Sequence, residues 1–319
     1  MNYGDLIADA FRMAWRNRYL WFFGFFIGGA AGYFNVSVPP STESSTSASG
    51  VPAWLVGIGG WAQANIALAV ALGAVVFVLF LVFFVGLTLV SAGGLVDSVA
   101  ALSRGERRSF ASTWRAGVRN LWRVFLYSLL FSLIGLVPLI VIAGPAALGI
   151  FGVVSATDSV GLRVLFISIV GLVALVLLLV ITVALYLVGQ LALRELVIGG
   201  RGIFSAIGGG YRLFRRNLGR TIVVWLIQFA IALAVTAVLF VVTFVIGIAQ
   251  TAGFFALSSA APYPLVVGVA VVVGLIVSLP LILFAAIFGV FNHAYWTLAY
   301  LQLTVEQPPR GEYSPSTSG

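Results

Sequence analysis

Long apolar stretches alternate with short polar segments along the chain, and this hydropathy pattern predicts six membrane-spanning helices. Each stretch reaches or approaches the roughly 20 helical residues that cross a hydrocarbon core. The predicted spans are residues 19–34, 66–90, 121–143, 164–189, 221–250 and 265–291. Pro138, the pair Gly144 and Pro145, and Pro280 each favour a kink. The fifth apolar run continues toward residue 260, and we expect a break near Gly247 or Gly253.

Composition supports an all-α integral membrane protein. Hydrophobic residues make up 61% of the chain and charged residues only 8%, far from the composition of soluble domains. All of the 17 basic residues are Arg, and the chain has no Cys. The absence of Lys excludes a P-loop and Schiff-base chemistry, and the absence of Cys excludes disulfides and thiolate metal sites. Abundant Ala, Gly, Val and Arg without Lys is typical of GC-rich prokaryotic genomes.

The distribution of arginine predicts the orientation in the membrane. Arginines precede the first span, follow the second and fourth spans, and occur in the tail, whereas Arg163 alone falls on the opposite side. The positive-inside rule therefore places both termini in the cytoplasm, as expected for a multi-pass protein of the inner (cytoplasmic) membrane. Because orientation accounts for the excess positive charge, we expect no nucleic-acid partner.

A short pattern recurs three times, directly before the first, third and fifth spans. It consists of an aromatic residue, Arg, three further residues, Arg and Asn. The copies are Phe11, Arg12, Arg16, Asn17; Trp114, Arg115, Arg119, Asn120; and Tyr211, Arg212, Arg216, Asn217. Their starts are separated by 103 and 97 residues, which predicts three parallel two-span repeats, residues 1–105, 106–202 and 203–311. The pairs Arg104–Gly105, Arg201–Gly202 and Arg310–Gly311 each follow an even-numbered span, as a helix stop does.

Each copy has helical periodicity, with aromatic and apolar residues on one face and arginines on the other. This pattern predicts cytoplasmic amphipathic helices that lie in the membrane interface and then turn into the following span. Anionic lipid headgroups attract such arginines by about 1 kcal/mol each. The candidate headgroup or anion contacts are Arg12, Arg16, Arg115, Arg119, Arg212 and Arg216. The alternative is that these residues only orient and anchor the protein.

Polar segments at two places predict disorder, namely the extracytoplasmic loop 36–53 and the tail 307–319. The basic N-terminus with its short apolar run also resembles a cleavable signal peptide. The same Arg and Asn pattern precedes two internal spans, so we expect the first copy to be retained as an anchor. Gly24, Gly28 and Gly32 form a small-residue stripe, which favours close helix packing over a ligand site.

Polar residues inside or beside the spans are the remaining candidates for chemistry. They are Asp97, Arg194, Glu195 and His293. A shift of 97 residues aligns Asp97 with Arg194, which leaves open an ion pair between neighbouring repeats or two solvated helix ends. A single His cannot build a metal site without further ligands, and no Ser lies in a nucleophile-elbow context. We therefore expect no catalytic residue, no metal and no cofactor, and we interpret His293 as structural.

The junction segments resemble those of a known group of proteins. The segments are residues 14–24, then Arg194 with Glu195, and residues 212–219. They are similar to uncharacterised prokaryotic polytopic membrane proteins, including the membrane domain attached to some glycerophosphoryl diester phosphodiesterases. The resemblance implies a helical membrane domain. No catalytic role carries over, because the chain has no soluble phosphodiesterase domain and lacks the acidic and His ligands of that enzyme.

These observations favour a non-enzymatic, membrane-organising or lipid-associated accessory protein. Its expected partners are the bilayer, especially anionic headgroups, and a membrane protein of unknown identity. The alternative is a transporter or channel for a lipid or small anionic solute, which needs a polar cavity at mid-membrane. An enzyme ranks third, because it requires titratable groups to converge, with Asp97, Glu195 and His293 as the candidates.

Overall fold

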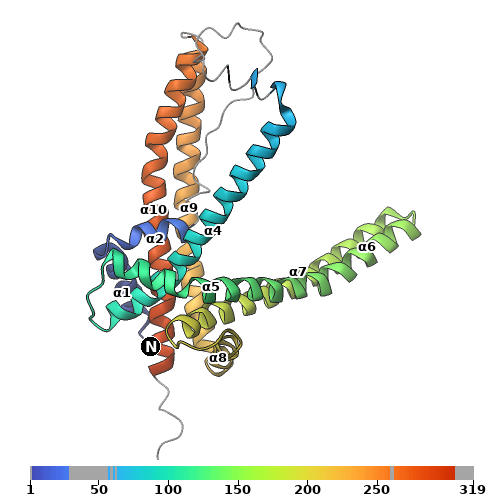
Figure 1. Cartoon of the computed structure of the whole chain (residues 1–319). Coiled ribbons are helices and arrows are strands. Elements are labelled where there is room, and N and C mark those ends of the chain that lie inside the picture. Colours follow the sequence, from blue (N-terminus) through green and yellow to red (C-terminus); the bar gives the residue numbers. More distant parts are fainter. Residues whose placement is uncertain (1, 29–56, 58–59, 62, 259–261, 306–319) are drawn as a thin grey trace, which may run out of the picture. The chain divides into compact units, whose positions relative to one another are not determined.

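The computed structural model describes residues 2–28, 57, 60–61, 63–258 and 262–305, and the named elements of this part are helices (Figure 1). They are α1 (Tyr3–Arg16), α2 (Leu20–Ile27), α4 (Ile66–Ser103), α5 (Phe110–Pro138), a π-helix (Leu139–Ala143), α6 (Gly144–Ala156), α7 (Val160–Val197), α8 (Ile203–Arg216), α9 (Leu218–Ser258) and α10 (Tyr263–Val305). The predicted disordered loop 36–53 and tail residues 307–319 lie outside the described residues.

Five described helical stretches are long and apolar enough to cross a membrane. They are Ile66–Ser103, Phe110–Ala156, Val160–Val197, Leu218–Ser258 and Leu265–Val305. The fold is therefore that of a helical multi-pass membrane protein. The first predicted span, residues 19–34, is not among the five. Its described part is the eight-residue helix α2, and residues 29–34 lie outside the described part of the chain.

The helix interiors bear on the sequence predictions at two places. Helix α9 continues through Gly247 and Gly253 to Ser258, so the predicted break there is wrong. A helical Gly costs about 1 kcal/mol relative to Ala, whereas breaking a helix in lipid leaves backbone groups without partners. After Pro138, α5 gives way to a π-helix that ends at Ala143, and α6 begins at Gly144. This irregularity falls where the missing Pro donor disrupts the helical hydrogen bonds.

The long helices have two chemically different parts. Helix α7 contains 38 residues, which corresponds to about 57 Å, nearly twice the hydrocarbon thickness. In its first part apolar side chains such as Leu179 are exposed, whereas Leu187, Leu191 and Leu196 in its last part are buried. Helices α4 and α10 show the same change along their length. Exposed apolar surface on this scale fits contact with lipid, and the buried ends pack against protein.

The described contacts fall into two compact units of the chain. One comprises residues 1–11, 92–226 and 293–319, and the other comprises residues 12–91 and 227–292. In the second unit, Gly24 of α2 and Gly28, which caps the end of this helix, lie directly against α10. A Cβ on Gly28 would lie 2.5 Å from the carbonyl oxygen of Ala285. The packing interpretation is confirmed for these two glycines, and Gly32 lies outside the described residues.

The first unit is held together by equally close helix contacts. Helix α8 packs against the end of α7, where a Cβ on Gly210 would lie 2.7 Å from the backbone nitrogen of Ala192. Helix α5 meets α7 through Tyr127, whose hydroxyl donates a hydrogen bond to the carbonyl of Gly189 at 2.7 Å. Helix α10 meets α9 through Tyr295, whose hydroxyl donates to the carbonyl of Val224 at 2.9 Å. This unit contains the candidate site.

Candidate functional site

The three Asn residues of the recurring pattern make the same local hydrogen bond. The side-chain amide of each donates to the backbone carbonyl four residues earlier. The distances are 2.9 Å for Asn17 to Met13, 3.0 Å for Asn120 to Ala116 and 3.2 Å for Asn217 to Leu213. The Asn of the pattern therefore satisfies a carbonyl at the junction, a role that the sequence pattern by itself did not reveal.

The second copy differs from the other two in its backbone. Helix α1 ends at Arg16 and α8 ends at Arg216, so Asn17 and Asn217 each follow a helix end. Helix α5, in contrast, runs unbroken from Phe110 through Asn120 to Pro138. The predicted turn between a separate interfacial helix and the following span is therefore wrong for the second copy. A capping box at Ser109 fixes the start of this continuous helix.

The arginines of the pattern are exposed in all three copies, while a small residue beside them is buried. The six predicted contacts, Arg12, Arg16, Arg115, Arg119, Arg212 and Arg216, are all exposed. The buried small residues directly precede the aromatic residue of each copy and are Ala10, Thr113 and Gly210. Sequence analysis concentrated on the aromatic and cationic faces and missed this small-residue face. Because these small residues and the arginines lie on different faces of each helix, one face packs closely and the arginines stay exposed.

A groove of about 750 Å³ lies along α8, where the ends of α7 and α10 contribute further side chains. Its lining residues are Glu195, Gly199, Arg201, Gly209, Tyr211, Arg212, Leu213, Arg215, Arg216, Tyr300 and Thr304. The size lies in the range of small-molecule sites. The structure thus brings together two predicted headgroup contacts, Arg212 and Arg216, with the predicted polar residue Glu195. Arg215 lies on the same helix, and Arg201, Tyr300 and Thr304 join these residues from other segments of the chain.

The charge of this groove is strongly unbalanced. Four of its lining residues are Arg, and Glu195 is the acidic residue among them. Both oxygens of Glu195 are already engaged, because Oε1 lies 2.7 Å from Arg201 Nη1 and Oε2 accepts a hydrogen bond from the Tyr300 hydroxyl. Arg212, Arg215 and Arg216 have no ion pair with any residue that the structure describes. The groove can therefore attract an anion.

In the corresponding region between α4 and α5, acidic side chains lie beside the arginines and balance their charge. The carboxylate of Asp97 lies 3.5 Å from Arg108 and 3.9 Å from Arg119. Glu106 is paired with Arg104 and Arg108 at 2.8 and 3.4 Å. The hydrogen bond from Arg104 lowers the pKa of the Glu106 carboxyl, and the nearby positive charges act in the same direction. Here the arginines have acidic partners within the protein.

Arg194 and His293 lie together in the interior of the same unit. The Arg194 side chain is fully buried, and its Nη1 donates to the backbone and side-chain oxygens of Gln190 at 2.8 and 2.6 Å. His293 lies within its electrostatic reach. Of the two alternatives left open by the sequence, the ion pair between Asp97 and Arg194 is not formed, because Asp97 faces Arg108 and Arg119 instead. The alternative of a solvated helix end is also wrong for Arg194, since tertiary packing covers it.

The Arg and Gly pairs act as helix stops only in part. Gly105 adopts a φ of +81° and its amide donates to Leu102 just after the end of α4, so the prediction is confirmed there. After α7 the residue with positive φ is Gly200, at +61°, whereas Gly202 is the N-cap of α8. The prediction for Gly202 is therefore wrong. Gly311 lies outside the described residues.

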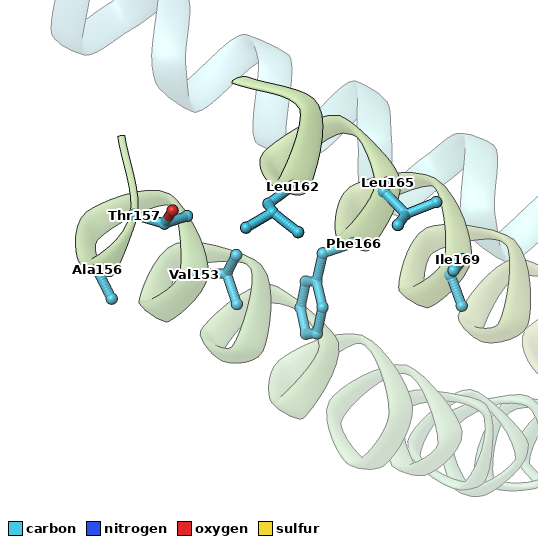
Figure 2. Close-up of a pocket in the computed structure, with 7 residues that line it drawn as sticks. All are labelled: Val153, Ala156, Thr157, Leu162, Leu165, Phe166 and Ile169. Atoms are coloured by element: carbon cyan, nitrogen blue, oxygen red, sulfur yellow. The ribbon is translucent and has the colours of Figure 1, made fainter. Parts of the chain in front are cut away.

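A second hollow, between α6 and α7, is almost wholly apolar. It has a volume of about 330 Å³ and is lined by the seven residues in Figure 2, of which Thr157 alone has a polar side chain. Its hydrocarbon surface suits contact with lipid chains. Within the described residues no group of three or more His, Asp or Glu side chains is placed to hold a metal ion.

A family model of unknown function, DUF7544, matches residues 14–307. The chain belongs to the DUF7544 family. The match covers Arg16 and Asn17 of the first copy of the pattern, the other two copies, the groove and the buried Arg194. No curated protein and no solved structure matches the chain. The resemblance to the membrane domain of the phosphodiesterases therefore stays a prediction.

Proposed function

We propose that this DUF7544 protein binds anionic phospholipid headgroups in the groove along α8, as a non-enzymatic, lipid-associated accessory protein of the cytoplasmic membrane. The observation that carries this proposal is the groove itself, in which Arg212, Arg215 and Arg216 share one lining surface while the acidic Glu195 is engaged by Arg201 and Tyr300. Guanidinium groups match phosphate geometry, and the charge adds about 1 kcal/mol per Arg near an anionic surface.

The groove has the features of a headgroup site. Tyr211 is half exposed beside the arginines, which suits an aromatic ring at the depth of the lipid headgroups. The hydroxyl of Thr304 adds a further polar group to the lining. Helix α7 leads directly to the groove, and its preceding part presents apolar side chains such as Leu175 and Leu179 to lipid. A bound lipid would therefore find a site for its phosphate and an apolar surface for its chains.

The proposed architecture has six spans in three parallel two-span repeats, with both termini cytoplasmic. The common Asn hydrogen bond and the common buried small residue in the three copies support this repetition. Single Cys residues introduced by Ser45→Cys and Gly202→Cys test the orientation, because the chain has no native Cys. An impermeant reagent should label the first from outside and the second only after the membrane is opened. The reverse labelling would overturn the orientation.

Native mass spectrometry tests the proposed function. Protein equilibrated with an equal mixture of phosphatidylglycerol and phosphatidylcholine should retain mainly the anionic lipid. The combined change Arg212→Gln, Arg215→Gln and Arg216→Gln should abolish that preference. The matched control, Arg104→Gln, Arg107→Gln and Arg115→Gln, removes the same charge and should keep it. Equal retention of both lipids by the wild type, or an equal loss in the two variants, would contradict headgroup binding in the groove.

Transport of a lipid or small anion remains the alternative function. A carrier requires a polar path at mid-membrane. Along α4 and α7, the central stretches carry exposed apolar side chains, including Phe77 and Leu172, which suit contact with lipid. This observation favours the accessory role. Uptake of radiolabelled phosphate into proteoliposomes, above the level of empty vesicles, would instead favour transport.

A further inference from the structure

Arg194 presents a vacant hydrogen-bonding edge in the protein interior. Its side chain is 0% exposed, and Nη1 is engaged by the two oxygens of Gln190. The other two nitrogens, Nε and Nη2, are buried and have no hydrogen-bond partner. These two N–H groups form the side of the guanidinium with which Arg binds an oxyanion through two parallel hydrogen bonds. The edge of the cation that is best suited to an anion thus has no hydrogen-bond partner among the described residues.

No acidic side chain in the described part of the chain forms an ion pair with Arg194. The titratable groups within electrostatic reach of Arg194 are Tyr127, Tyr186 and His293. The adjacent Glu195 is engaged by Arg201 and Tyr300, and the Tyr127 hydroxyl donates to Gly189. A buried charge without a counterion is strongly unfavourable. A bound anion would offset the cost of burying the Arg194 charge.

His293 supplies a second, independent observation. Its Nδ1 atom is also buried and has no hydrogen-bond partner. When this nitrogen carries a proton, the two residues together offer three vacant N–H donors, Nε and Nη2 of Arg194 and Nδ1 of His293. A carboxylate has two oxygens, whereas a phosphate group can offer a further acceptor. The donor set therefore favours phosphate.

We propose that Arg194 and His293 form an interior site for a phosphate group, supplied by an anionic lipid or by free phosphate. Gln190 orients the guanidinium by holding Nη1, so that Nε and Nη2 face the bound oxygens. This site shares no residue with the lining of the α8 groove. It is therefore distinct from the proposed headgroup groove, and each can fail without the other.

Thermal unfolding of delipidated protein in a maltoside detergent tests the site. The Tm of the wild type should rise by several degrees with inorganic phosphate, or with short-chain phosphatidylglycerol, relative to chloride at equal ionic strength. A response to phosphate identifies the free anion as a ligand, and a response to the lipid alone identifies the headgroup. No rise with either probe would overturn the proposal.

Two variants test whether the rise in Tm comes from ligand binding at Arg194 and His293. Arg194→Lys keeps the charge but removes the paired donors, and His293→Gln removes the imidazole. Both changes are tested in protein that already carries Arg212→Gln and Arg216→Gln, because the proposed groove also binds phosphate. This groove variant should keep part of the rise, and adding either change should remove most of the rise that is left, which separates this site from the proposed function. If Arg194→Lys fails to fold, His293→Gln decides the question. A rise that is undiminished in the folded variants would show that phosphate acts elsewhere and would overturn the proposal.

Discussion

The junction of α4 with α5 and the junction of α7 with α8 carry the same Arg and Asn pattern but use its charge differently. At the first junction, Asp97 and Glu106 lie beside the arginines, and the chain passes into the span as one continuous helix. At the second, Glu195 is engaged by Arg201 and Tyr300, α8 is a separate helix, and three arginines line an open groove. The groove that we propose as the headgroup site therefore forms where the acidic residue is engaged by Arg201 and Tyr300, and not by the arginines of the pattern.

Close packing of α8 on α7 should be the most sensitive feature of the second junction. Gly210→Ala places a Cβ 2.7 Å from the backbone nitrogen of Ala192, so the helices have to separate. We expect a loss of about 1–3 kcal/mol in the free energy of unfolding. The matched change is Gly208→Ala on the same helix, where a Cβ meets nothing within 4 Å. It should gain about 0.5–1 kcal/mol from helix propensity.

Thermal or chemical unfolding of the two variants measures this difference. A Gly210→Ala protein that was as stable as Gly208→Ala would show that α8 does not pack on α7 at this position.

Freeing the arginines of the first junction should make it resemble the second. Asp97→Asn removes the carboxylate that lies near Arg108 and Arg119. We expect anionic lipid to bind more tightly by about 1 kcal/mol, or roughly fivefold. Titration with phosphatidylglycerol measures the change, and phosphatidylcholine serves as the control lipid. Unchanged binding would mean that Asp97 does not neutralise its neighbours.

The Asn hydrogen bond should matter less than packing or charge. Asn217→Ala leaves the carbonyl of Leu213 without its side-chain donor, although the backbone amide of residue 217 still reaches it. A cost of about 0.5–1.5 kcal/mol is expected, as for a typical single hydrogen bond. Asn217→Asp, which cannot donate when ionised, should lose a similar amount. Full stability of both variants in thermal unfolding would remove the proposed role of the repeated Asn.

The smallest effect should be the titration of Glu106 in the exposed turn between α4 and α5. Its pKa is lowered from the ordinary value of 4.5, so its favourable contribution is present above pH 4.5 and is lost as the pH falls through the folded pKa. Carboxyl NMR should find a midpoint below 4.5, and Arg104→Gln should move it upward. A midpoint that stayed the same in that variant would exclude Arg104 as the main cause.

Local patterns in the sequence predicted more of the fold than of the site. Hydropathy found the helices, because lipid requires long apolar segments with internally bonded backbones. The exposed arginines Arg212 and Arg216 were also found, because charge and helical period are local properties. The contribution of Tyr300 and the burial of Arg194 beside His293 were not found. The residues of each pair, Tyr300 with Glu195 and Arg194 with His293, lie about a hundred positions apart in the sequence. Their contact depends on how the helices pack, which the periodicity of a single helix does not reveal.

The corrections have the same physical origin. Gly253 failed to break α9, because the hydrophobic environment favours continuous hydrogen bonding over local helix propensity. For Arg194 the sequence left two alternatives open, an ion pair with Asp97 or a solvated helix end. The sequence shows only that Arg194 lies near the end of a helix. Its burial depends on α5 and α10, which cover the end of α7.

Anionic-lipid affinity in two matched double variants tests the central claim most directly. Arg212→Gln with Arg216→Gln and Arg115→Gln with Arg119→Gln remove the same two positions of the pattern from the two junctions. The first variant should bind phosphatidylglycerol about tenfold to thirtyfold more weakly, given about 1 kcal/mol per lost Arg and the lost groove contacts. The second should lose less than about threefold, because Arg119 is already near Asp97. Equal losses in the two variants would contradict the account, since total charge alone would then explain lipid binding.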